Sequence, residues 1–584
     1  MNMGECTFSR DELIRSLQQR DAPQPLIGLN NLPHDWKCSR RVYRNGKCIF
    51  HAEHKDPKKF NNAFIRELKL LANHDRYDFI GFIFPNSEIV GIKFDKPVNF
   101  TGSIFNGEIR FVDVEFQDAA IFDGCEFQKA TRFDNTNHKG MTSFVGSAFK
   151  DDVQFNGIKF ERKALFNANF YKKVNFINSS FNNAEFHFTN FKNQVEFRNT
   201  IFRNQSLFLN SSFNDALFYK VIFKGNIAFK GSKFFDKISF INCKFKRGVY
   251  FNNCKFYHGL TFWLISFYKE AIFSESLFNS ALFSYIYIYD VSFFENCLFL
   301  GPTKFRYMFP RNREGILNFI GGHLKNRFGF EQFLNEMETT KRQELERIWG
   351  INFEQLKAIV NKGRISMKTV SFDMPDMTFV RFVNVEWDRK GIGIGPLRLD
   401  RIVVYDEKLI EESEGHRDYE RLAHIYWALR RNYEMNGRYA EAGDFFISEM
   451  EMRRLNLAPP PLIKGRKMTA WEIIRWTVLS LGWWRRNLLS PIAIYRLLSL
   501  YGESYVLAFL WIIATIVLFA LLRFLVPVQS EQPIDILDNP LSRSILAFFQ
   551  LRSEDSLDYF ERIFGGLLLG NLFIALRRRL ERRR

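Results

Sequence analysis

With 584 residues the chain is long enough for several domains, and its net charge of +18 indicates an anionic partner, either nucleic acid or a membrane surface. Its seven cysteines are scattered, which argues against a disulfide framework and indicates a reducing compartment. Residues 1–20 contain no apolar run, so we expect no cleaved signal peptide and a cytoplasmic N-terminal part.

A ladder of phenylalanines dominates residues 91–305. Phenylalanine accounts for 67 of the 584 residues, and in this region it recurs mostly at alternating steps of six and five, beginning at Phe94, Phe100 and Phe105. Neither a helix nor an alternating strand has this period, which instead favours a solenoid whose short strands each send one ring inward. The residue two places before each ring alternates between large, as in Val98, and small, as in Ser103.

Two local features test the regularity of the ladder. The stretch DNTNHKGMTS (134–143) has no ring at the expected place, so we expect a bulging loop there. Cys243 and Cys254 are eleven residues apart, but each occupies the small position two before a phenylalanine. We therefore interpret them as small buried side chains and not as half of a metal site.

The ladder resembles the pentapeptide-repeat family, whose fold is a right-handed, four-sided (quadrilateral) β-helix. The resemblance implies a mainly β fold from Gly91 to Phe305, with about 22 residues per coil instead of the family's value of about 20. Around it the sequence predicts an N-terminal cap region (1–90), a helical insertion (306–369), a β-rich C-terminal cap (370–415) and a helical hairpin (416–461).

The C-terminal part, 505–584, is predicted to be a two-span membrane module. Residues Tyr505–Leu522 form an uncharged run that would span about 27 Å as a helix. The shorter run Ile563–Leu576 precedes the sequence RRRLERRR, which would hold this end in the cytoplasm, so both termini are expected there. Residues 462–504 are predicted to form interfacial helices, with these residues at the membrane surface: Trp471, Trp476, Trp483, Trp484, Arg485 and Arg486. Because the excess positive charge lies near the spans, we expect a lipid bilayer and no nucleic acid as the anionic partner.

Between the two runs lies a short apolar segment, Ile545–Leu551, which would reach only about 10 Å as a helix. It can be an interfacial turn or a pore helix that dips halfway into the membrane, and both interpretations stay open. If a pore exists, its candidate lining residues are Gln550, Arg552, Ser553, Glu554 and Asp555. This segment has no glycine, so potassium selectivity is not supported. Gly566 and Gly570 form a small-xxx-small step that would pack helices in an oligomer.

Several segments outside the ladder look like parts of bacterial membrane pentapeptide-repeat proteins with ion-channel-like ends. These segments are GKCIFHAEHKD, LRRNYEMNGRYAEAGDFFISEMEMRR, YGES and GGLLLGNLFIALRRRLERR. The resemblance implies a protein of the bacterial inner membrane, a homo-oligomer whose channel-like pore is coupled to a cytoplasmic β-helix that binds an unidentified protein partner. The alternative is a non-conducting, membrane-tethered scaffold for protein interactions.

The sequence contains no recognisable catalytic or nucleotide-binding motif, so we expect neither an enzyme nor a cofactor. Cys38, Cys48, His51 and His54 have the ligand types of a zinc site. The nine residues between the two cysteines are too many for a zinc knuckle, so no metal is predicted and these four remain candidates only.

Overall fold

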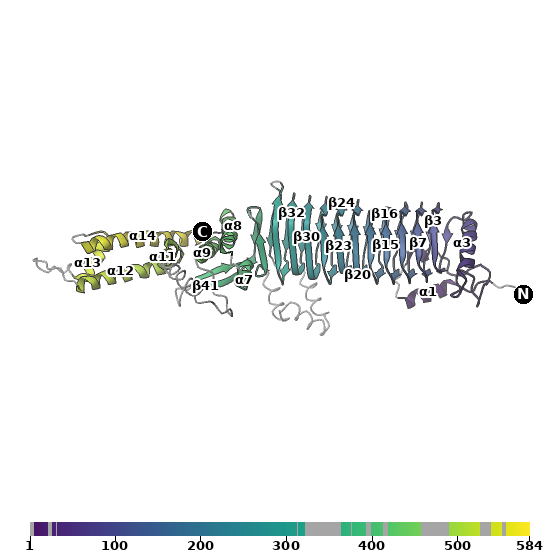
Figure 1. The fold of residues 1–584 in the computed structure, drawn as a ribbon, viewed down its shortest axis with the longest axis horizontal. Helices are drawn as coiled ribbons and strands as arrows, with labels where there is room; N and C mark the ends of the chain where they lie inside the picture. Colours follow the sequence, from purple (N-terminus) through teal and green to yellow (C-terminus); the bar gives the residue numbers. More distant parts are fainter. Residues whose placement is uncertain are drawn as a thin grey trace, which may run out of the picture. The chain divides into compact units, whose positions relative to one another are not determined.

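The computed structural model describes residues 5–20, 26–30, 32–311, 314–321, 364–374, 376–392, 399–412, 418–456, 490–525, 539–551 and 556–583. They belong to two compact units, the first formed by Met1–Asp373 with Phe379–Glu386 and the second by Met374–Thr378 with Trp387–Arg584. The first unit is a β-solenoid of parallel stacked coils with an N-terminal cap, and the second is a β-hairpin followed by helices (Figure 1). Most of the predicted helical insertion, residues 322–363, lies outside the described residues.

Three helices form the cap: α1 (Arg10–Gln19), α2 (Ile27–Asn30) and α3 (Pro57–Leu71). Phe64 of α3 packs against the rings of Phe79 and Phe84 in the first coil, with ring centroids 5.1 and 5.5 Å apart. Leu13 of α1 lies over Gly102, a coil corner at φ +70° where an added Cβ would collide with the leucine. The cap therefore covers apolar groups that the first coil would otherwise expose at an open sheet end.

The solenoid has four faces, because each strand pairs in parallel with the strand that follows one coil later. The first face contains β1 (Tyr77–Asp78), β5 (Val98–Asn99), β9 (Ala120–Ile121), β13 (Thr142–Ser143), β16 (Lys159–Leu165), β19 (Ser180–Glu185), β22 (Ser206–Leu207), β25 (Ile227–Ala228), β29 (Val249–Tyr250), β31 (Ala271–Ser274), β33 (Ser292–Glu295), β36 (Leu317–Ile320) and β39 (Val380–Val383). The second contains β2 (Ile83–Phe84), β6 (Ile104–Phe105), β10 (Glu126–Phe127), β14 (Ala148–Phe149), β17 (Asn169–Phe170), β20 (Asn190–Arg198), β23 (Ser212–Tyr219), β26 (Lys233–Phe234), β30 (Lys255–Phe267), β32 (Leu277–Ile288) and β34 (Leu298–Phe299).

The long strands turn a corner and contribute to two or three faces, so several of them appear again on the other two faces. The third contains β3 (Ser87–Val90), β7 (Ile109–Val112), β11 (Thr131–Asp134), β15 (Val153–Asn156), β18 (Val174–Ile177), β20, β23, β27 (Ile238–Ile241), β30, β32, β35 (Thr303–Pro310) and β38 (Val370–Asp373). The fourth contains β4 (Lys93–Phe94), β8 (Glu115–Phe116), β12 (Asn137–His138), β16, β19, β21 (Ile201–Phe202), β24 (Ile222–Phe223), β28 (Lys244–Phe245), β30, β32 and β35.

The phenylalanine ladder is the core of the solenoid. Phe105, Phe127, Phe149 and Phe170 stack in one column, with ring centroids 4.5, 4.4 and 4.8 Å apart and nearly parallel planes. Paired residues differ by 22 from Phe105 to Phe127 and by 21 from Phe149 to Phe170, so the column contains coils of two lengths, both close to the predicted value. Each ring is removed from water and touches rings above and below, which contributes about 1.5–3 kcal/mol of transfer free energy per side chain.

The small side chain two residues before a ring also donates a hydrogen bond to a backbone carbonyl. Ser103 Oγ donates to the carbonyl of Phe79 at 2.7 Å, and Cys254 Sγ donates to the carbonyl of Phe229 at 2.7 Å. The residue just before this position is in the left-handed region, as at Asn253 (φ 52°), where asparagine is tolerated better than most residues. The cysteines are therefore buried members of the repeat, as predicted, and they also satisfy corner carbonyls.

The prediction of a bulging loop at 134–143 is wrong. Strands β12 and β13 continue the ladder, and His138 takes the place of the missing ring, with centroids 4.6 Å from Phe116 and 4.9 Å from Phe160. The side chain is fully buried, and Thr142 Oγ1 lies 2.9 Å from its Nδ1. The planar imidazole can replace a phenylalanine ring here because the Thr142 hydroxyl forms a hydrogen bond with its Nδ1.

Burial lowers the pKa of His138 to about 3, so the folded protein holds this ring neutral. The unfolded chain binds a proton below about pH 6.5. We therefore expect the free energy of unfolding to fall by about 1.4 kcal/mol per pH unit from this residue as the pH drops from about 6.5 toward about 3. His138→Phe should remove that part of the pH dependence in thermal unfolding of the detergent-solubilised chain, whereas replacement of the exposed His258 should not. Parallel pH profiles for the wild type and His138→Phe would contradict the assignment.

The coils extend beyond the predicted bounds 91–305 at both ends. They begin at β1 and include β38 and β39, so residues 370–373 and 380–383, which the sequence assigned to a C-terminal cap, are strands of the solenoid itself. Phe372 and Phe382 continue the ring columns over Phe305 and Phe319. Beside them β37 (Ile365–Ser366) pairs with β40 (Val385–Glu386).

The second unit begins with an antiparallel hairpin of β41 (Asp388–Ile392) and β42 (Leu399–Val403). Then follow α7 (Tyr405–Glu412), α8 (Tyr419–Met435), α9 (Tyr439–Asn456), α11 (Pro491–Ser499), α12 (Tyr505–Leu525), α13 (Pro540–Phe548) and α14 (Ser556–Arg583). Helices α8 and α9 form the predicted hairpin, and Gly437 at φ +71° makes the turn. Trp387 Nε1 donates to Tyr433 Oη at 2.8 Å, which fixes α8 to the start of β41.

Candidate functional sites

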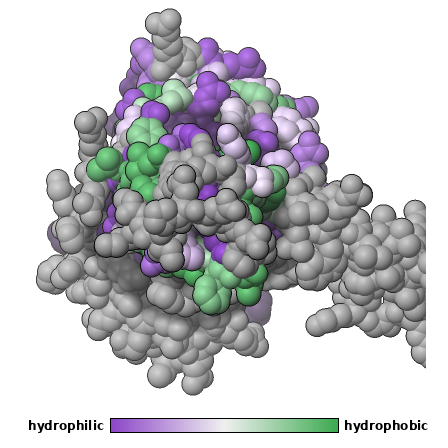
Figure 2. All heavy atoms as spheres, turned by 90° about the vertical axis from the view of Figure 1, so that its left-hand side faces the viewer, coloured by the Kyte–Doolittle hydropathy of each residue, from purple (hydrophilic) through white to green (hydrophobic). Residues whose placement is uncertain are grey.

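Two C-terminal helices are long and apolar enough to cross a membrane: α12, and residues Ser556–Leu580 of α14. Their large hydrophobic side chains are mostly exposed, which on α12 applies to Val506, Phe509, Leu510, Ile513, Val517, Leu518, Leu521, Leu522, Phe524 and Leu525. Figure 2 shows exposed hydrophobic side chains (green) beside hydrophilic ones (purple), seen from the side on which Figure 1 draws these helices. Large apolar side chains exposed along a helix in this number mark an interaction surface for lipid or protein.

Helix α13 packs against both long helices. Phe548 is fully buried and shares a small core with Ile512 of α12 and Leu568 of α14. A Cβ added to Gly565 would lie 2.5 Å from the Phe548 carbonyl oxygen, so glycine is required where α13 meets α14. The short predicted half-helix is therefore part of the module's core and begins earlier than predicted, at Pro540.

The predicted packing glycines lie beside this contact and not in it. A Cβ on Gly566 would come no closer than 3.5 Å to Gln550 Nε2, and one on Gly570 would meet nothing within 4 Å among the described residues. Gln550 is exposed at the end of α13, at φ +65°. The other pore candidates (Arg552, Ser553, Glu554, Asp555) and the interfacial candidates (Trp471, Trp476, Trp483, Trp484, Arg485, Arg486) lie outside the described residues.

A cluster of charged side chains is buried between α12, α13 and α14; we call it the intramodule charge cluster. Arg523 lies 2.6 Å from Asp558 Oδ1 and 2.7 Å from Glu561 Oε2, and its side chain is only 7% exposed. Arg543 lies 3.7 Å from Asp558 Oδ2, and the Ser544 hydroxyl contacts Glu561. The formal charges of two arginines and two carboxylates balance, as buried charges require.

The sequence analysis missed this cluster, because Arg523, Asp558 and Glu561 all lie between the two apolar runs Tyr505–Leu522 and Ile563–Leu576 that it assigned to the membrane. A usable signal was present. Asp558 and Glu561 are three residues apart, which places two acids on one face of a helix that is apolar further on. Two acids on a spanning helix indicate a buried basic partner.

A second buried cluster joins the helical hairpin to the apolar helices. Glu451 of α9 lies 2.6 Å from Arg496 of α11 and 2.9 Å from Arg454, and it accepts a 2.8 Å hydrogen bond from Tyr501 Oη. Burial by itself would raise the pKa of Glu451, but the charges of Arg454 and Arg496 outweigh it and lower the pKa. Nearby, Arg578 of α14 donates to the Tyr501 carbonyl at 2.8 Å. These contacts fix α9, α11 and α14 together.

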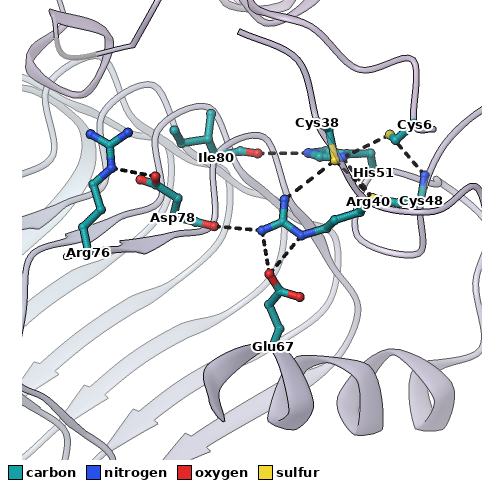
Figure 3. Close-up of polar contacts among 9 residues, drawn as sticks. All are labelled: Cys6, Cys38, Arg40, Cys48, His51, Glu67, Arg76, Asp78 and Ile80. Atoms are coloured by element: carbon teal, nitrogen blue, oxygen red, sulfur yellow. Dashed lines mark hydrogen bonds and ion pairs between the residues drawn. The ribbon is translucent and has the colours of Figure 1, made fainter. Parts of the chain in front are cut away.

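The N-terminal cap contains a cysteine–histidine cluster, formed by Cys6, Cys38, Cys48 and His51 (Figure 3). All four are buried, and their possible ligand atoms lie within 4.8 Å of one another. The hydrogen bond from Cys48 and the contact with His51 hold the pKa of Cys38 well below its usual range, which favours a thiolate at this sulfur.

Three of the four zinc candidates named from the sequence thus come together, and the fourth does not. His54 is exposed, and its place is taken by Cys6, which lies 32 residues before Cys38 in the chain. Sequence reasoning missed Cys6 because a distance of this size carries no local pattern. Only the folding of the N-terminal segment onto the first coil brings it to the other three.

Among known families, the sequence profile described as pentapeptide repeats (9 copies) matches residues 218–264, which lie within the solenoid. Comparison with curated proteins and with solved structures gives no match. The four-sided stack of coils and this match together define a mainly β solenoid protein with pentapeptide repeats. Its C-terminal part adds two helices that meet the length and composition of membrane spans.

Proposed function

We propose that the chain is a membrane-anchored protein of the bacterial inner membrane, in which the C-terminal helices of several copies form a channel-like pore coupled to a cytoplasmic β-helix. The β-helix binds a protein partner, and no enzymatic activity is assigned to it. The observation that carries the proposal is the intramodule charge cluster, enclosed between two apolar helices and a short third one. Ionisable groups buried between membrane-spanning helices are costly, and they indicate a functional site such as an ion or proton pathway.

The orientation in the membrane follows from charge. Arg578 lies 3.1 Å from Glu503, so the end of α14 and the start of α12 are on the same side of the module. That side carries the terminal arginines and continues into α9 through Glu451. Under the positive-inside rule it is the cytoplasmic side, and the charge cluster lies toward the opposite side.

Oligomerisation is supported by the surface that one copy leaves uncovered. Two spans cannot enclose a pore, so several copies are needed. Gly570 has no neighbour within 4 Å of an added Cβ among the described residues, and Phe564, Leu567 and Phe573 of the same helix are exposed. The missing side chain at Gly570 would let a helix of a second copy approach α14 closely, and the exposed apolar side chains would pack against it.

Partner binding by the β-helix is supported by a strip of exposed aromatic rings on successive coils. Trp263, Tyr285 and Tyr307 are each about two-fifths exposed, and the rings of Tyr285 and Tyr307 stack at 4.7 Å. Tryptophan and tyrosine are enriched at the centres of protein interfaces, because they bury a large area and lose little conformational entropy.

Cross-linking tests the oligomer. The cysteines that the structure describes are all buried, so Gly570→Cys adds an accessible thiol to α14. In native membranes we expect this variant to form disulfide-linked dimers, whereas Leu568→Cys, at a position that packs inside one copy, should not. Liposomes containing the full chain should pass ions, and they should stop doing so when the charge cluster is disrupted by Arg523→Ala.

A protein that is monomeric in mild detergent, gives no cross-link at residue 570 and passes no ions would overturn the pore. It would support the alternative, a non-conducting tethered scaffold. That alternative is favoured by one observation: the sequence from α13 through Asp555 contains no glycine, so it lacks the residues that form the backbone of a potassium filter.

A further inference from the structure

We propose that Cys6, Cys38, Cys48 and His51 bind a structural Zn²⁺ ion that fastens the N-terminal cap to the first coil of the solenoid. Cys6 comes from the segment before α1, whereas Cys38 and the pair Cys48 and His51 come from two places in the segment between α2 and α3. Their exposed fractions are between 1 and 4%. Three thiols and one imidazole are a ligand set typical of structural zinc sites.

The distances match tetrahedral zinc. With Zn–S near 2.3 Å and Zn–N near 2.0 Å, tetrahedral geometry places sulfurs about 3.8 Å apart and a sulfur about 3.5 Å from a nitrogen. Cys38 Sγ and Cys48 Sγ are 3.8 Å apart, and Cys6 Sγ lies 3.6 Å from His51 Nδ1. Cys48 Sγ is somewhat closer to Nδ1, at 3.1 Å. The sulfurs are much too far apart for a disulfide, which needs about 2.0 Å.

The groups around the cluster orient it for a metal (Figure 3). His51 Nε2 lies 3.0 Å from the Ile80 carbonyl, so it carries the proton and leaves the Nδ1 lone pair facing the sulfurs. The Cys48 amide donates to Cys6 Sγ at 3.2 Å, and Arg40 Nη1 lies 3.7 Å from Cys38 Sγ. Donors aimed at sulfur stabilise thiolates, and Arg40 offsets the negative charge that three thiolates leave on a zinc centre.

The position of the cluster explains what the metal does. Ile80 lies between β1 and β2 in the first coil, and Arg40 is held by Glu67 of α3 at 2.7 Å. The cluster therefore joins the coil, α3 and the segment before α1. Four protein ligands leave no open coordination position, so the chemistry is structural and not catalytic. Cys48 and His51 are close in sequence, with two residues between them. The other two ligands, Cys6 and Cys38, come from remote positions.

Metal analysis of the full chain tests the proposal. Protein purified in detergent without chelators should contain about one zinc per chain, and Cys38→Ser, Cys48→Ser and His51→Ala should each reduce that to below about a tenth. Two matched controls should keep their zinc: Cys254→Ser, which places serine in a slot that serine fills elsewhere in the solenoid, and His54→Ala, next to the cluster in sequence.

Because a ligand variant can lose zinc by unfolding, a second measurement uses the wild-type chain. Exchange of the bound ion for Co²⁺ should produce thiolate-to-cobalt charge transfer and the intense visible bands of a tetrahedral site, which adventitious surface binding does not give. Substoichiometric zinc with no such bands, or a Cys38–Cys48 disulfide found by mass spectrometry in freshly purified protein, would overturn the proposal.

Discussion

Replacing Arg523 with alanine is expected to destabilise the C-terminal module by about 3–5 kcal/mol, because it leaves Asp558 and Glu561 buried without their main partner. Both carboxylates have completely buried side chains; after the substitution Arg543 lies 3.7 Å from Asp558, and the Ser544 hydroxyl still contacts Glu561. In an apolar environment the unpaired charge costs more than the pair contributed. The loss should appear as a lower unfolding temperature of the detergent-solubilised chain and as faster amide exchange in α13.

Two further variants separate charge balance from packing. Arg562→Ala removes an arginine from the same helix as the two acids but outside the cluster, and should cost less than about 1 kcal/mol. Arg523→Met combined with Glu561→Gln removes one charge of each sign and keeps the pair of Arg543 with Asp558. This double variant should recover most of the lost stability. If Arg523→Ala is as stable as Arg562→Ala, the cluster has no role in holding the three helices.

Replacing Glu451 with alanine is expected to loosen the helical hairpin from the apolar helices, at a cost of about 3–5 kcal/mol. The substitution leaves Arg454 and Arg496 without their shared carboxylate and removes the acceptor of the Tyr501 hydroxyl. Hydrogen exchange should therefore increase in α9 and α11 and stay unchanged in the solenoid. Glu441→Ala, which removes the acid of the partly exposed Arg438–Glu441 pair on the same helix, is the control and should cost less than about 1 kcal/mol.

The same contact is expected to depend on pH with a defined sign. The pKa of Glu451 is lowered in the folded protein, so its stabilising effect is present above the unfolded value near 4.5 and is lost as the pH falls through the lower folded value. Glu451→Gln should abolish this acid-dependent loosening of α9 while keeping the hydroxyl of Tyr501 paired. An acid response of α9 that persists in Glu451→Gln would assign the effect to another group.

How far the sequence predicted the fold differs from one part of the chain to another. The ring positions predicted a solenoid, because each phenylalanine occupies an equivalent position in its coil and therefore recurs at a regular spacing. That the solenoid has four sides was implied only by the resemblance to the pentapeptide-repeat family. The prediction failed where another residue type replaces phenylalanine. The sequence predicted a loop around His138, although its ring stacks between Phe116 and Phe160. The pattern does not reveal that Thr142 meets the imidazole and makes it an acceptable substitute.

The sequence by itself determined the features that depend on local order: the period of the coils, the small side chain two places before a ring, and the apolarity of α12 and α14. Only the tertiary structure decided which distant polar groups meet. Cys6 joins Cys38, Cys48 and His51, and Arg523 meets Asp558 and Glu561, across separations of 32 and 35 residues that carry no periodic signal. The physical reason is that a buried charge or metal ligand must be satisfied by whatever the fold brings near, and nearness in space is set by the packing of whole elements and not by spacing along the chain.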